Sequence, residues 1–276
     1  MKPTHLFSTI LMAGCMTAIS LCTACSDDDG PTLRPTLPGN EGGILKKVEH
    51  LGGVTSTYDW EFTYDDGRLT KAVGQLRDPY ADIDMSYSYT CRLGYGDRRV
   101  TVSSSGDKSI AVTLNGSGYI EKMTVDRDIY QFYYMDGRLK GWEKTIFENN
   151  FGGAMQYRSS ATIEYKDGDL STITYTETGN PPVVLTLTPT TIPNRNGLLP
   201  ETIGKELGVL GYEHLYYAGL LGRPTTHLVG QIDVAYPTLP EKNSSTTFEY
   251  NNKNGNTVLC NYHTPAGEVA SVKYTY

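Results

Sequence analysis

One short pattern recurs along this chain and constrains its fold more than any other feature. An alternating apolar and polar stretch runs into Asp-Gly and a second such stretch follows, at Trp60–Val73, Tyr130–Leu139 and Ile163–Ile173. Looser copies surround Asn115–Ile120 and Pro265–Val269. Asp and Gly tolerate the positive φ of a tight two-residue turn, so each copy predicts a β-hairpin. Consecutive hairpins predict an antiparallel, up-and-down meander.

Alternation between apolar and polar residues is clearest from Ile83 to Tyr95, where the odd positions are apolar or aromatic. A period of two with one apolar face is typical of strands that bury one side. We expect about fifteen strands in all. Open sheets beyond ~10 strands are rare because free edges pair with other chains. The sequence therefore predicts an all-β fold, a large meander that closes into a barrel.

Three strands that leave these turns space their apolar residues by three instead of two. The pairs are Ile120 with Met123, Leu170 with Ile173, and Val269 with Val272. Strict alternation would place the members of each pair on opposite faces. We predict a β-bulge after each of these turns, because one extra residue restores the phase.

Helical spacing interrupts the strands at residues 198–221, where apolar positions recur every three or four residues. Glycines weaken this segment, so we predict two short helices broken near Gly208 or Gly211. The first begins after Pro200, and Gly222–Pro224 ends the second. A barrel of this size encloses a wide lumen. We hypothesise that the helical insert fills it.

The first residues predict export. Residues 1–24 combine Lys2 with a short apolar run and read as a signal peptide. The small residues before Cys25 resemble the lipobox of bacterial lipoproteins, in which this cysteine is acylated. Ser26–Asp29 resembles the surface-export signal of Bacteroidetes lipoproteins. The alternatives are an ordinary cleaved signal and a solvated acidic tether. We expect a tether at 25–43, a domain at 44–276, and a lipid-anchored protein at the outer membrane, exposed at the cell surface.

The lipobox, the Tyr-Asp-x-Gly-Arg-Leu hairpins and the stretch Tyr217–Arg223 that leads to His227 together resemble one family. This family comprises uncharacterised Bacteroidetes lipoproteins whose domain of unknown function has a porin-like β-barrel fold. The resemblance covers residues 44–276. It implies a meandering barrel and no catalytic residues. We do not expect the barrel to span the membrane, because its strands lack a lipid-facing apolar band with aromatic girdles.

Motifs that carry chemistry are absent from the sequence. Four histidines of the mature chain are scattered without metal-ligand spacing, and no nucleophile elbow or P-loop occurs. We expect no catalytic residue, metal site or cofactor. A net charge of −7 argues against nucleic-acid binding. His214 lies on the apolar face of the insert and reads as a hydrogen-bonded core histidine.

Carboxylates and thiols leave alternatives open. Aspartates cluster at two places, one with Asp78, Asp82 and Asp84 and the other with Asp126 and Asp128. We interpret both clusters as solvated turns, with Ca²⁺ binding as the alternative. A hydrolase with paired carboxylates leaves no spacing signature and stays a hypothesis. Cys91 and Cys260 occupy apolar-phase positions, and we favour buried free thiols over a disulfide.

Aromatic residues outside the apolar phase are the candidate ligand contacts. Most of the 21 tyrosines fall on the periodic apolar faces. We expect Trp142, Tyr133, Tyr216 and Tyr217 to be exposed and to contact a ligand. The first functional hypothesis is binding of an extracellular glycan or peptide. The second is a structural or assembly role in the outer envelope.

Overall fold

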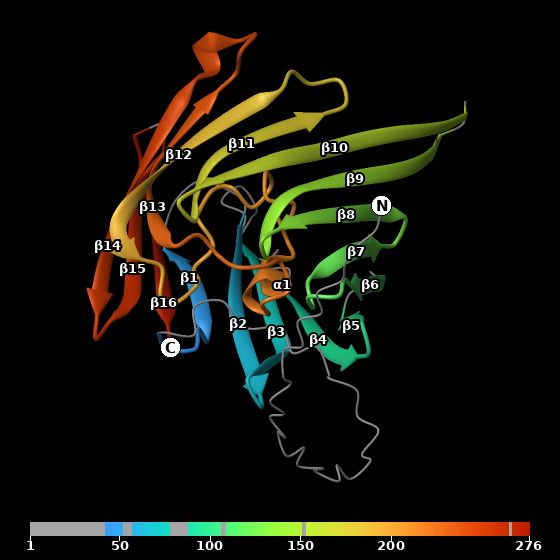
Figure 1. Ribbon diagram of the computed structural model, residues 1–276, viewed down its shortest axis with the longest axis horizontal. Helices are drawn as coiled ribbons and strands as arrows, with labels where there is room; N and C mark the ends of the chain where they lie inside the picture. Colours follow the sequence, from blue (N-terminus) through green and yellow to red (C-terminus); the bar gives the residue numbers. More distant parts are fainter. Residues whose placement is uncertain (1–41, 52–56, 78–87, 106–108, 151–152, 265–266) are drawn as a thin grey trace, which may run out of the picture. The chain divides into compact units, whose positions relative to one another are not determined.

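Antiparallel strands, each hydrogen-bonded to its neighbours along the chain, close into one barrel in the computed structural model (Figure 1). The described residues are 42–51, 57–77, 88–105, 109–150, 153–264 and 267–276. The predicted signal peptide, Cys25 and the group Asp78–Asp84 lie outside them. The described part contains sixteen strands, and β16 pairs with β1 to close the barrel. The prediction of an all-β, up-and-down barrel is confirmed.

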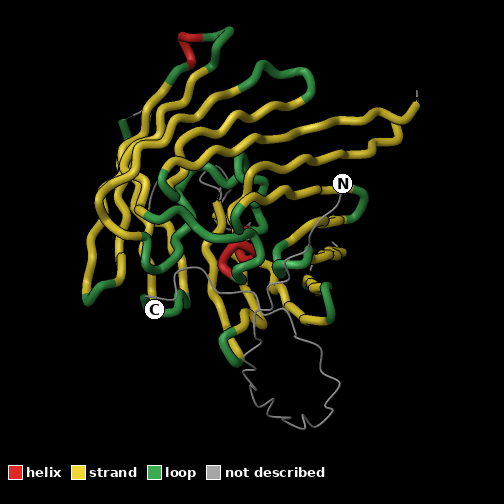
Figure 2. The backbone as a smooth tube through the Cα atoms, viewed as in Figure 1, coloured by secondary structure: helices red, strands yellow, loops and turns green. Residues whose placement is uncertain are grey.

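The bounds of the strands are β1 (Lys47–Leu51), β2 (Thr57–Asp65), β3 (Arg68–Arg77), β4 (Ser88–Gly96), β5 (Arg99–Ser104), β6 (Ser109–Leu114), β7 (Ile120–Val125), β8 (Asp128–Met135), β9 (Arg138–Asn150), β10 (Gly153–Lys166), β11 (Asp169–Glu177), β12 (Val183–Pro193), β13 (His227–Ala235), β14 (Ser244–Lys253), β15 (Asn256–His263) and β16 (Val269–Thr275). Helix is confined to α1 (Glu213–Tyr217) and the single 3-10 turn η1 (Pro240–Lys242) in the described residues (Figure 2).

The predicted hairpin turns form at the Asp-Gly pairs. Asp66 and Gly67 have φ values of 45° and 70°, and Asp136 and Gly137 have 52° and 72°. Two successive positive φ angles are what a tight hairpin turn requires, since they match the twist of the flanking strands. The conformation of these corners therefore follows from the local chemistry of Asp and Gly.

Two of the three predicted bulges are present. Leu114 pairs with Ile120 and Thr113 with Lys122, which leaves one extra residue in β7, and β11 has the same irregularity after Leu170. The bulge predicted after Val269 is wrong. β16 pairs with β15 in regular register, and Val269 is exposed while Ala270 and Val272 face the core.

The barrel has an apolar inner face and a polar outer face. Buried inward residues include Phe62, Cys91, Val102, Phe132, Ile163, Leu187, Phe248 and Val272. Exposed residues of the same strands include Glu61, Arg92, Thr101, Gln131, Glu164, Thr247 and Lys273. A barrel that crosses a bilayer has the opposite arrangement, with an apolar band outside. No helix among the described residues has the length and apolarity to cross a membrane.

Residues 198–221, the insert, pack inside the barrel (Figure 1). The Trp142 indole Nε1 donates to the Glu206 carbonyl at 2.8 Å, and the ring of Trp60 lies 4.9 Å from that of His214. Tyr130 of β8 packs edge-on against Tyr212. The inner wall and the insert thus form one hydrophobic core, as hypothesised.

The two predicted helices are shorter than expected. Residues before α1 form a single helical turn, because Gly208 (φ 72°) ends it with Gly208 N–H on the Lys205 carbonyl and Val209 N–H on the Gly204 carbonyl. Gly219 (φ 76°) ends α1 in the same way. This bonding pattern at a left-handed glycine is the Schellman motif. The predicted break near Gly208 is confirmed. The predicted first helix is wrong, because only a single turn forms there.

Cys91 and Cys260 are fully buried free thiols, as favoured from the sequence. Burial raises the pKa of the Cys91 thiol to about 11. A thiol held in its neutral form in an apolar wall packs as a small hydrophobic side chain.

Gly208 offers a test of the filled lumen. A Cβ at this position would meet Trp142 Cδ2 at 2.7 Å, whereas a Cβ at Gly67 would meet nothing within 4 Å. Both residues have positive φ, so both Ala variants carry a backbone cost of about 1–2 kcal/mol. We expect Gly208→Ala to lower the free energy of unfolding by roughly 2 kcal/mol more than Gly67→Ala, measured by denaturant titration. Equal losses would contradict packing of the insert against Trp142.

Candidate functional site

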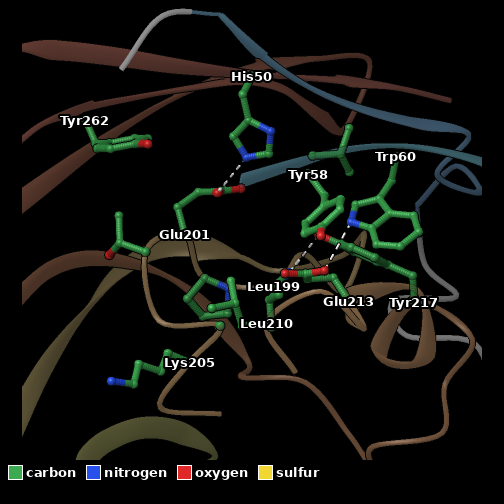
Figure 3. Close-up of a pocket in the computed structure, with 14 residues that line it drawn as sticks. His50, Tyr58, Trp60, Leu199, Glu201, Lys205, Leu210, Glu213, Tyr217 and Tyr262 are labelled. Carbon is green, nitrogen blue, oxygen red and sulfur yellow. Dashed lines mark hydrogen bonds and ion pairs between the residues drawn. The ribbon is translucent and has the colours of Figure 1, made fainter. Parts of the chain in front are cut away.

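A cavity of about 210 Å³ lies between the inner wall of the barrel and the insert (Figure 3). β1 contributes Val48 and His50 to its lining, β2 contributes Tyr58 and Trp60, and β15 contributes Tyr262. The remaining lining residues belong to the insert: Leu199, Pro200, Glu201, Thr202, Gly204, Lys205, Leu210, Glu213 and Tyr217. The space is large enough for several water molecules or a small ring.

His50 connects two carboxylates at this cavity. Its Nδ1 lies 3.2 Å from Asp59 Oδ1, and its Nε2 lies 3.3 Å from Glu201 Oε2. Figure 3 shows the imidazole and the Glu201 carboxylate pointing toward one another. Burial lowers the pKa of His50, but the hydrogen bonds and charges of Asp59 and Glu201 outweigh it and raise this pKa to about 9. His50 is therefore a cation at neutral pH.

Asp59 also accepts a backbone hydrogen bond where β1 and β2 separate. The register between these strands contains Lys47 with Glu61 and Val48 with Trp60. Beyond it, the backbone N–H of His50 donates to Asp59 Oδ1 at 2.8 Å. A side chain thus takes the place of a ladder carbonyl and satisfies a buried donor. This bond holds His50 in position at the edge of the cavity.

Glu201 and Glu213 have different environments in the same cavity. The Glu201 Oε1 atom accepts a hydrogen bond from the Tyr274 hydroxyl at 2.8 Å. Glu213 accepts from Trp60 Nε1 at 3.2 Å and from the Gly211 N–H at 3.0 Å. Burial, assisted by the charge of Glu201, raises the pKa of Glu213 to about 7. Glu213 is therefore divided between its neutral and ionised forms at neutral pH.

The residues predicted to contact a ligand do not gather at one place. Tyr133, with 46% of its surface exposed, lies on the outer face of β8 as expected. The predicted exposure of Trp142, Tyr216 and Tyr217 is wrong, because all three are buried. A bulge after Leu139 turns Trp142 inward, and the other two belong to α1 inside the barrel. Tyr217 lines the cavity.

His214 is buried as predicted, but it is not hydrogen-bonded to the described residues. Neither ring nitrogen has a partner among them. Burial lowers the pKa of His214 to about 3, so the ring stays neutral. It packs against the ring of Trp60 as an aromatic core residue.

Asp126 and Asp128 belong to the β7–β8 hairpin. Asp126 has φ 53° in the turn, and Asp128 lies 2.9 Å from Lys144 Nζ. This geometry is that of a solvated turn with an ion pair. Within the described ranges no group of three or more His, Cys, Asp or Glu side chains has metal-binding geometry.

Sequence reasoning missed His50, Asp59, Glu201 and Glu213. A weak signal existed for one of them, since His50 shares the inward phase of Val48 in a strand whose burial alternates. Glu201 lies 151 residues from its partner His50, and Glu213 lies 153 residues from Trp60. No spacing rule connects residues that meet only when the barrel has closed.

The fold and this site define the class of the protein as a porin-like β-barrel. The chain belongs to the family described as domain of unknown function (DUF4595) with porin-like fold, whose model matches residues 62–259. No curated protein matches the chain.

Two solved structures share this fold. The crystal structure of a porin-like protein from Bacteroides uniformis has 20% sequence identity and a TM-score of 0.65, over 84% of this chain and 98% of that chain. A porin-like protein from Bacteroides vulgatus has 11% identity and a TM-score of 0.51 over the same shares. At these identities the similarity establishes the fold alone.

The ion pairs of His50 predict a pH dependence of stability. The folded pKa of about 9 exceeds the ordinary value of 6.5, so this stabilisation is fully present below pH 6.5 and is lost as the pH rises through 9. We expect it to amount to roughly 2–3 kcal/mol. We measure the free energy of unfolding by urea titration at pH 6.5 and at pH 9.5. Between these two pH values it should fall less in His50→Gln than in the unsubstituted protein. An identical decline in both proteins would show that His50 is not the titrating group.

Proposed function

We propose that this chain is an outer-membrane lipoprotein, anchored through Cys25 at the cell surface, whose barrel binds an extracellular ligand such as a glycan or a peptide. The observation that carries the binding function is the cavity between β1, β2, β15 and the insert. It combines carboxylates with aromatic rings beside a hydrophobic core. Few convergent polar groups in a concave, largely aromatic site are typical of ligand binding.

The anchoring part of the proposal rests on the leader and on the outer face. Small residues precede Cys25, and acidic residues follow it directly. The exposed face of the barrel is rich in Glu, Lys, Arg and Thr, which favours a domain surrounded by water and held at the membrane by lipid.

A structural role in the envelope is the second candidate. The filled lumen and the polar outer face favour it, because much of the barrel interior serves to pack the insert. A hydrolase is the third candidate. It is supported by Glu201 and Glu213 in one cavity, since a general acid requires a carboxyl with a raised pKa, as Glu213 has, and a second carboxyl nearby.

Ligand binding is tested with glycan and peptide arrays and the full-length chain in detergent micelles. We expect Glu213→Gln to weaken binding of a captured ligand about tenfold, because it removes a charged acceptor from the cavity. Tyr133→Ala is the matched control on the outer face and should bind normally. Binding that is lost in Tyr133→Ala and retained in Glu213→Gln would move the site to the outer face. Complete absence of binding would favour the structural role.

The anchor is tested by substituting Cys25. We expect Cys25→Ser to abolish incorporation of labelled fatty acid and to release the protein from the membrane fraction. Cys22→Ser is the control, because Cys22 belongs to the part of the chain that processing removes. Membrane association of Cys25→Ser equal to that of the unchanged protein would contradict the proposal.

A further inference from the structure

The charged groups around the cavity do not balance. Among the described residues, His50 and Lys205 are the cations of its lining, and each already pairs with a carboxylate that does not line it. His50 lies 3.2 Å from Asp59 Oδ1 and also pairs with Glu201, and Lys205 Nζ lies 3.2 Å from Glu177 Oε2. Lys205 also lies over the ring of Tyr175, at 5.0 Å. Four carboxyl groups, those of Asp59, Glu177, Glu201 and Glu213, thus surround two cations, and Glu213 has no cationic partner among the ion pairs of the described residues.

Excess negative charge in a partly enclosed space is unfavourable. A buried carboxylate is costly unless a cation or several hydrogen bonds compensate it. Glu213 is only partly exposed, and it accepts hydrogen bonds from neutral donors, among them the Trp60 indole and the Gly211 amide. Its raised pKa expresses this cost, since taking up a proton removes the charge. A cation entering the cavity would remove the same cost without protonation.

The walls of the cavity are suited to such a cation. Rings of Tyr58, Trp60, Tyr217 and Tyr262 line the space that Glu201 and Glu213 face (Figure 3). A positive charge near an aromatic face gains about 0.5–2 kcal/mol, most when it is desolvated. Carboxylates combined with aromatic rings bind ammonium groups for this reason. A neutral hydroxyl group gains much less binding free energy from the carboxylates or from the aromatic rings.

We infer that the cavity receives an ammonium group of the ligand, held between Glu201 and Glu213 and against the surrounding aromatic rings. This inference rests on the proposed binding function and specifies the chemistry of its ligand. An amino sugar, a lysine side chain and a peptide N-terminus all carry such a group. The volume of about 210 Å³ limits the bound part to a small group and not a whole oligomer.

Matched probes that differ only in charge test the inference by calorimetric titration of the full-length chain in detergent micelles. The amino-sugar pair is glucosamine trimer and its N-acetylated form. The lysine pair is Nα-acetyl-lysine N-methylamide, with a free side-chain ammonium, and Nα-acetyl-norleucine N-methylamide. The peptide pair is trialanine amide with a free or an acetylated N-terminus. In at least one pair we expect the amine to bind about tenfold tighter than its neutral partner, measured at pH 8 for the lysine pair and at about pH 7 for the amino-sugar and peptide pairs, whose amines lose their proton near pH 8. The pair that responds identifies the source of the ammonium.

Substitutions assign this preference to the cavity. Glu213→Gln and Glu201→Gln should each reduce the ratio of amine to neutral affinity about tenfold. Glu249→Gln is the matched control, because Glu249 is exposed on β14. The unfolding transition of each variant, followed by circular dichroism, establishes that it is folded. A folded Glu213→Gln with an unchanged ratio would overturn the inference.

The pH dependence provides a second readout. Affinity for the lysine probe should rise from pH 6 to pH 8 as Glu213 ionises, because the pKa of Glu213 is about 7 and the lysine ammonium stays charged. The other titratable groups that line the same cavity are His50, Tyr58, Glu201, Lys205, Tyr217 and Tyr262. His50 stays protonated over this range, since its pKa is about 9. The norleucine probe should show no such rise.

The outcomes separate the two proposals. If a neutral probe binds as tightly as its amine, the ammonium inference fails and the binding function stands. If none of the six probes binds at millimolar concentration, the ammonium inference fails, and the glycan and peptide arrays decide the binding function. A preference for the amine that disappears in Glu213→Gln supports both.

Discussion

The structure depends on covering the apolar inner face of a wide barrel. Sixteen amphipathic strands enclose a lumen that side chains of the wall alone do not fill. The chain supplies the missing volume from its own insert, whose leucines and tyrosines pack against Trp60 and Trp142. Because the apolar side faces inward, the outer face is free to be polar. This reverses the arrangement of a transmembrane barrel on a similar scaffold.

The candidate site is a consequence of how the lumen is filled. The insert turns sharply at Gly208 and Gly211, and irregular backbone does not match the smooth curvature of the wall. Thr202 has φ 71° beside the resulting cavity, a conformation that β-branched residues rarely adopt. Polar groups accumulate at this mismatch, where β1 and β2 also separate and Asp59 replaces a ladder bond. The cavity therefore lies where the regular strands of the wall meet the irregular backbone of the insert.

The charged side chains around this cavity determine its chemistry. One protonated histidine pairs with two carboxylates, and Glu213 is a largely buried acid whose pKa of about 7 lies at neutral pH. Elsewhere in the core, burial keeps His214 and Cys91 neutral, by lowering the pKa of the imidazole and raising that of the thiol. The difference is the presence of ionised neighbours. Only the cavity between β1, β2 and the insert combines ionised neighbours with accessible volume among the regions described above.

Local chemistry in the sequence determined the strands, the Asp-Gly corners and two of the bulges, because alternation and positive φ act over a few residues. These features were sufficient for the fold class and for the position of the insert. The tertiary structure alone decided the length of the helices, the burial of Trp142, Tyr216 and Tyr217, and the pairing of His50 with Glu201. The contact between His50 and Glu201 spans 151 residues and becomes defined only when the barrel closes, and the Trp142 indole bonds Glu206 across 64 residues.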